Sequence, residues 1–207
     1  MSIEDDVRPG LAGYWDRFVG PHPSRAATIG TVGTVVAASL WADRGLSAPA
    51  PCRSSIALRV LAIDLWGGAW VNNTRACVRW YERPGQGAKG HLGFASLHIA
   101  HPAVIAVLDV NAGSRSRISA IRWASLHFSW MIGSAAVIAA APRRARLPIA
   151  ASSALIGTGL DRILGSSTAA PWFAPIYYSK LLIGHAAGSI WNAGPTGVNR
   201  LGRATRY

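Results

Sequence analysis

The sequence predicts an all-α integral membrane protein: a bundle of about six transmembrane helices, preceded by an amphipathic interfacial helix. Two features predict this fold. The 207 residues are 50% hydrophobic but only 14% charged, whereas about 25% of residues in ordinary soluble domains are charged. The apolar residues also gather into six segments, each near the roughly 20 residues that cross a bilayer as a helix. These segments are 26–41, 55–71, 91–109, 118–141, 147–164 and 172–191.

The stretch LAGYWDRFVG, residues 11–20, predicts a short amphipathic helix ahead of the first apolar segment. Its apolar residues recur at helical spacing, and Gly20-Pro21 should end the helix. We expect this helix to lie on the membrane surface, within an N-terminal cytoplasmic segment of residues 1–25. The apolar residues are Leu11, Tyr14, Trp15, Phe18 and Val19.

The basic residues are shared unevenly between alternate loops. If all six segments cross the bilayer, the side with both termini, the 72–90 loop and the 142–146 loop holds 13 Lys or Arg, and the other side holds five. The positive-inside rule then places both termini in the cytoplasm. The chain would consist of the N-terminal segment, a six-helix transmembrane domain over 26–191 and a basic cytoplasmic tail over 192–207. Five tryptophans also fall at segment ends, as in an interfacial belt: Trp41, Trp70, Trp123, Trp172 and Trp191.

The excess of positive charge fits a membrane surface better than a nucleic acid. The chain has 21 Lys or Arg against 9 Asp or Glu, a balance found in proteins that bind either partner. The basic residues lie between the apolar segments, however, and build neither a continuous basic helix face nor an aromatic stacking platform. We therefore expect the bilayer and a hydrophobic small molecule as partners, and no nucleic acid. A homo- or hetero-oligomer stays open.

Ionisable residues inside the apolar segments are the candidate functional residues. Counted at 1.5 Å per residue, Asp64 lies about 14 Å from the outer end of its segment, near the bilayer midplane. The same count places His101 and His127 at that depth, and His98 and His185 together in a second layer nearer the cytoplasm. Such groups cost several kcal/mol unless they pair or face a hydrated interior. We therefore predict Asp64, His98, His101, His127 and His185 as catalytic residues.

Histidine moves protons in either direction near neutral pH, and a neighbouring carboxylate fixes its tautomer and raises its basicity. The leading hypothesis is a small polytopic membrane enzyme that acts on a lipid or isoprenoid-like substrate as an isomerase, cyclase or transferase. Arg75 and Arg79 in the 72–90 loop would hold the polar head group of the substrate. The chain contains no P-loop, no GxSxG and no Rossmann glycine pattern, which leaves the common cofactor-binding classes without support.

Two alternatives stay open. In the first, His98 with His185, or His101 with His127, ligates haem iron or another metal through neutral imidazole, and the protein is an electron-transfer or proton-relay subunit. In the second, it is a small proton-coupled transporter, because a weak self-similarity at an offset of 97 residues is what inverted three-helix repeats would produce.

Several other polar positions carry narrower expectations. Arg59 could pair with Asp64 or extend to the membrane surface. Asp109 and Asp161 lie near the outer segment ends, where exposure at the interface is expected. Pro102 should free a backbone carbonyl near His101. The sequence assigns no role to Lys180, which lies nearly in the middle of the last segment.

Overall fold

The computed structural model describes residues 3–44, 46 and 51–191, and every regular element in this part of the chain is helical. The helices are α1 (Gly10–Val19), α2 (Arg25–Trp41), α3 (Cys52–Val71), α4 (Arg75–Tyr81), α5 (Gly87–Ser96), η1 (Leu97–Ile99), α6 (Ala100–Asn111), α7 (Arg117–Ala140), α8 (Arg143–Leu164), α9 (Phe173–Tyr178), η2 (Ser179–Ile183) and α10 (Gly184–Trp191). Each predicted apolar segment coincides with one helical rod, since α5 to α6 and α9 to α10 are continuous. The predicted basic tail, 192–207, lies outside the described residues.

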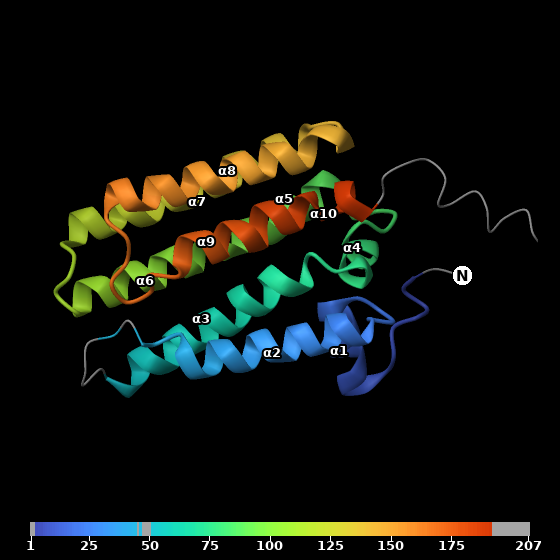
Figure 1. Cartoon of the computed structure of the whole chain (residues 1–207), viewed down its shortest axis with the longest axis horizontal. Coiled ribbons are helices and arrows are strands. Elements are labelled where there is room, and N and C mark those ends of the chain that lie inside the picture. The colour runs from blue at the N-terminus through green and yellow to red at the C-terminus, as the bar shows by residue number, and fades with distance from the viewer. Residues whose placement is uncertain (1–2, 45, 47–50, 192–207) are drawn as a thin grey trace, which may run out of the picture.

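The long helical rods lie side by side in a bundle. The α2–α3 pair forms one edge and the α7–α8 pair the opposite edge, with the α5–α6 and α9–α10 rods between them (Figure 1). The short helices α1 and α4 lie at one end of the bundle, where α5 and α8 begin and α10 ends (Figure 1). We call this end the α4 end.

Three helices are long and apolar enough to cross a membrane: Cys52–Val71, Gly87–Asn111 and Arg117–Ala140. Helices of this length and composition indicate an integral membrane protein. They correspond to the second, third and fourth apolar segments of the sequence.

The N-terminal helix α1 ends as predicted, but its apolar face is divided. Gly20 has φ +84° and follows the last residue of α1. Trp15 and Val19 pack against α4 through Cys77, whereas Leu11 and Tyr14 are exposed. The helix therefore uses one part of its apolar surface to join the bundle and leaves the other part uncovered.

The predicted tryptophan belt is wrong at Trp123. Its ring is buried, and its indole N–H donates a hydrogen bond to Asp161 Oδ1 at 3.1 Å. Trp41, Trp70 and Trp191 are exposed at the ends of their helices. Trp123 lies close to a helix end in sequence, but α7 turns its ring inward to contact Phe173 of α9.

The contact between α2 and α3 generates a prediction about two glycines. A Cβ atom on Gly30 would lie 2.0 Å from the Trp70 ring, whereas one on Gly33 would meet no atom within 4 Å. We expect Gly30→Ala to lower the free energy of unfolding by about 1–3 kcal/mol, the usual cost of overpacking. Gly33→Ala should leave it unchanged or slightly higher, because alanine favours helix. Thermal unfolding of both variants in one detergent checks this, and equal loss in both would contradict it.

Candidate functional site

Three basic side chains converge on one oxygen of Asp64. Lys180 Nζ lies 2.5 Å from Asp64 Oδ2, His101 Nε2 lies 2.9 Å from it and His98 Nε2 lies 3.6 Å from it. The side chain of Lys180 is 2% exposed, whereas that of Asp64 is 42% exposed. The basic groups are thus enclosed by the bundle, and the carboxylate has one open side. We call these four residues the Asp64 centre.

The local structure around Lys180 brings this side chain to Asp64. Lys180 lies in the π-helical turn Ser179–Ile183, and single π turns in α-helices frequently occur at functional sites. A Cβ atom on Gly68 would lie 2.4 Å from Lys180 Cε, so the absence of a side chain there leaves room for the lysine to pass α3. This pairing was not predicted from the sequence. The available signal was depth, because Lys180 is eight residues from the outer end of its segment and Asp64 is nine from the outer end of its own.

The two histidines of the centre are held as a stacked pair. The rings of His98 and His101 are 5.0 Å apart with an interplanar angle of 12°, and His98 Nδ1 is 2.9 Å from the carbonyl oxygen of Phe94. Pro102 has no N–H to give to the helix ladder, so the carbonyl of His98 lacks its usual partner. The hydroxyl of Tyr177 donates to that carbonyl at 3.3 Å. The structure therefore brings Asp64 and His101 together, as the depth count predicts, and joins α6 to α9.

The structure places His127 in a different cluster. Its Nδ1 is 2.7 Å from the Tyr178 hydroxyl, and its Nε2 is 3.1 Å from Asp161 Oδ1. His127 and Asp161 are both buried. Grouping His127 with Asp64 is therefore wrong, because its ring faces α8 and α9 rather than α3. The expected interfacial exposure of Asp161 is wrong for the same reason.

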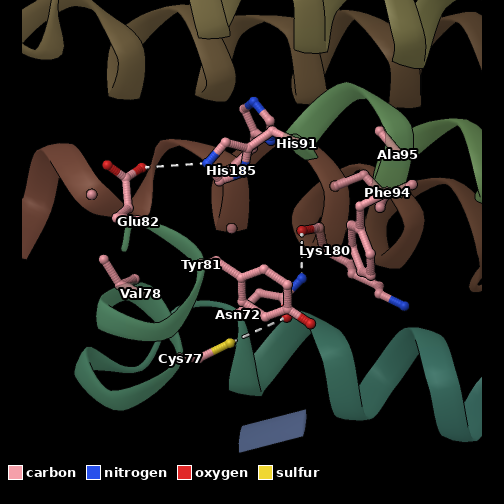
Figure 2. Close-up of a pocket in the computed structure, with 13 residues that line it drawn as sticks. Asn72, Cys77, Val78, Tyr81, Glu82, His91, Phe94, Ala95, Lys180 and His185 are labelled. Carbon is pink, nitrogen blue, oxygen red and sulfur yellow. Dashed lines mark hydrogen bonds and ion pairs between the residues drawn. The ribbon is translucent and has the colours of Figure 1, made fainter. Parts of the chain in front are cut away.

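His185 is likewise separated from His98. Its ring packs edge-on against His91 with centroids 4.6 Å apart, and His91 Nε2 lies 3.9 Å from Glu82 Oε1. Arg146 also approaches Glu82, at 3.8 Å. Figure 2 shows His91, His185 and Glu82 near one another and Lys180 farther along the same cavity. The predicted layer of His98 with His185 is therefore wrong; His185 belongs to a third polar cluster near the α4 end.

Arg75 and Arg79 lie on the exposed surface of α4 and engage neighbouring segments. The Arg75 guanidinium lies over the Trp191 ring, 4.7 Å from its centroid, and Arg79 donates a hydrogen bond to the carbonyl of Pro21 at 3.4 Å. Neither arginine lines the cavity beside the histidines, whereas Arg146 does. The structure thus does not bring the predicted head-group residues to the predicted catalytic residues.

The remaining charged residues pair elsewhere. Arg59 forms an ion pair with Asp43 at 3.0 Å, so it extends toward the helix end and does not reach Asp64. Asp109 is fully buried, and its Oδ1 accepts hydrogen bonds from the Ser167 hydroxyl and the Ala169 N–H, both at 3.0 Å. The expected exposure of Asp109 is wrong, because it anchors the loop between α8 and α9.

The arrangement does not fit either predicted pair of haem ligands. His98 stacks on His101, His185 packs on His91, and both ring nitrogens of His127 already face Tyr178 and Asp161. Among the residues that the structure describes, no three His, Cys, Asp or Glu side chains are placed to hold a metal ion.

A further hollow is separate from the Asp64 centre. It is a mostly apolar groove of about 640 Å³ between α6 and α7, lined by residues such as Ala103, Val107 and Phe128. Ala103 and Val107 lie on the face of α6 opposite His101, given the helical repeat of 3.6 residues. A much smaller cavity, of about 40 Å³, borders Lys180.

No protein-family model, curated protein or solved structure matches this chain. Its function is therefore inferred from its own side chains.

The Asp64 centre generates a prediction about stability. Asp64→Asn would leave a buried lysine without its counter-ion, and we expect it to lower the free energy of unfolding by about 3–5 kcal/mol. Lys180→Met should cost less, because Asp64 keeps two histidines and its open side. The double variant should recover most of the loss, since both charges are gone.

Thermal or denaturant unfolding in detergent measures all three variants. Asp43→Asn is the matched control, because its partner Arg59 is partly exposed and such pairs contribute about 0–1 kcal/mol. Additive losses in the double variant would show that Asp64 and Lys180 do not depend on each other.

Proposed function

We propose that the protein is a small multi-pass membrane enzyme that performs acid–base chemistry on a lipid or isoprenoid-like substrate at the Asp64 centre. The observation that carries this proposal is the asymmetry of Asp64. Its Oδ2 atom is held by enclosed basic groups, while the side chain as a whole stays 42% exposed. Val60, one turn earlier on the same face of α3, is also exposed. In a bilayer this opening faces lipid, so a hydrophobic substrate reaches the carboxylate sideways.

The roles follow from the contacts. Asp64 exchanges a proton with the substrate, because it alone in the centre has an open side. Lys180 and His101 keep the carboxylate oriented and compensate its charge. His98, at a longer distance from the same oxygen, supports the stack. The second cluster, His127 with Asp161 and Tyr178, is enclosed and serves to join α7, α8 and α9.

The proposal includes six membrane spans with both termini in the cytoplasm. Three rods beyond the three apolar helices, α2, α8 and α9 to α10, run alongside them in the same bundle (Figure 1). Ile29 of α2 and Leu155 and Ile163 of α8 are exposed, as expected for side chains in contact with lipid. The uncovered Leu11 and Tyr14 of α1 support the interfacial position of that helix.

Solvent deuterium tests the proposed chemistry. Purified protein is incubated in D2O with defined mixtures of membrane lipids and isoprenoids, and the extracts are examined by mass spectrometry. Proton transfer to carbon leaves deuterium in the substrate, and a group transfer gives a product of new mass. We expect either change with the wild type, and a loss of about 10²-fold or more with Asp64→Asn, the usual contribution of a general acid or base.

Asp43→Asn is the control that should keep full activity, because Asp43 pairs with Arg59 away from the centre. Equal product with the wild type and with Asp64→Asn would contradict the proposal. A proton flux in proteoliposomes that depends on Asp64, with no chemical change in any lipid, would assign the protein to the transporters instead.

A further inference from the structure

Two cavities adjoin one another between the Asp64 centre and the α4 end. The inner cavity, of about 40 Å³, is bordered by Lys180, Asn72 and Tyr81 (Figure 2). The outer cavity, of about 140 Å³, is bordered by Ala88, Ala139 and Arg146. Glu82, His91 and His185 line both cavities. The two cavities therefore share these three polar side chains in their walls.

The size and the lining of the cavities suit water. A water molecule needs about 10–15 Å³ of such volume and two to four polar partners. Because each water takes about 30 Å³ in the liquid, the inner cavity has room for about one water and the outer one for about five. Glu82, His91 and His185 offer donors and acceptors around both, and Asn72 does so beside Lys180. A cavity with these partners fills with water, whereas an apolar one stays dry.

The route ends at the Asp64 centre. Lys180 borders the inner cavity, and its ammonium group contacts Asp64. Beyond the centre, away from the α4 end, the buried ring of Phe173 stacks on that of Tyr177, with centroids 4.7 Å apart, and packs at a tilt against that of Trp123, with centroids 5.1 Å apart. The two polar cavities thus reach the centre from the α4 end.

We infer that water enters the bundle from the α4 end as far as Lys180 and delivers protons to the Asp64 centre from that side of the membrane, with His91 and His185 as the relay. Each imidazole accepts a proton from the water chain at one ring nitrogen and releases one from the other. The ring is then neutral again but in its other tautomer, and a ring flip or a proton exchange through water returns it to the first. When Asp64 takes a proton from the Lys180 ammonium, the resulting amine regains one from the water beside it. The use of these protons rests on the proposed function, whereas the water route does not.

Thiol accessibility to silver ions tests the water route. The native Cys77 itself lines the inner cavity, so the experiment uses the Cys77→Ala background, in which only Cys52 remains. Ala95 lines the inner cavity, and Ala135 on α7 is equally buried but lines neither cavity. Ala95→Cys and Ala135→Cys are therefore a matched pair.

Proteoliposomes are treated externally with silver nitrate, and modification is read by mass spectrometry as protection from later alkylation. We expect Ala95→Cys to react about tenfold faster or more than Ala135→Cys, because a dry site is reached only when the helices open locally. Val78→Cys on α4, which also borders the inner cavity, should behave like Ala95→Cys and covers the case in which one variant fails to fold. Ala139→Phe, at the outer cavity, should slow the reaction of silver with both of these introduced thiols.

Cys52 marks the orientation of each molecule, because it is exposed at the start of α3, at the opposite end of the bundle (Figure 1). An impermeant maleimide added outside labels Cys52 only in molecules whose α4 end faces the vesicle interior. In those molecules, external silver should fail to reach the thiol introduced by Ala95→Cys. Equal, slow reaction of the Ala95 and Ala135 variants would overturn the water route. Reaction from the same side as Cys52 would overturn its direction. Neither result depends on turnover, so failure of this inference and failure of the proposed enzyme activity are separate outcomes.

Discussion

The pairing of Lys180 with Asp64 is the interaction on which the rest of the interior depends. An enclosed ammonium in an apolar bundle is tolerated only with a carboxylate in direct contact, because removing one partner leaves an uncompensated buried charge. That requirement fixes the position of η2 against α3. It also explains the close approach at Gly68, where a side chain would occupy the space of the lysine stem.

His98 and His101 extend the same constraint to the continuous helix from α5 to α6. His98 and His101 share the oxygen that Lys180 holds, so α5 to α6 is tied to the α3 contact. The backbone carbonyl of His98, which Pro102 leaves without its usual partner, accepts a hydrogen bond from the Tyr177 hydroxyl. This hydrogen bond connects the histidine pair to α9. Three rods therefore meet at one carboxylate. The proposed catalysis, the proposed water route and the register of the helices all concern the same few atoms, and this is why we place the proposed function there.

The sequence predicted the helices well because segment length and apolar character are local properties. The 172–191 segment, for example, matches the continuous rod at 173–191, although nothing in it indicated the π turn at Ser179–Ile183. The position of a residue along its helix was also predictable, because the rise per residue is constant. Counting residues placed Asp64 and His101 at the same level, and the two side chains are in contact. The direction in which each side chain points from its helix was not predictable. His127 and His185 face other helices because the rotation of each helix is set by tertiary contacts, which residue counting does not include.

A dipolar-coupling measurement by solid-state NMR in lipid bilayers tests the central contact most directly. The sample carries ¹⁵N at Lys180 Nζ and ¹³C at the Asp64 carboxyl carbon, assigned by loss of the signals in Asp64→Asn and Lys180→Met. Our account predicts a strong coupling, as required by an Nζ to Oδ2 distance of 2.5 Å. A lysine nitrogen with no measurable coupling to that carbon would place Lys180 elsewhere and contradict the ion centre.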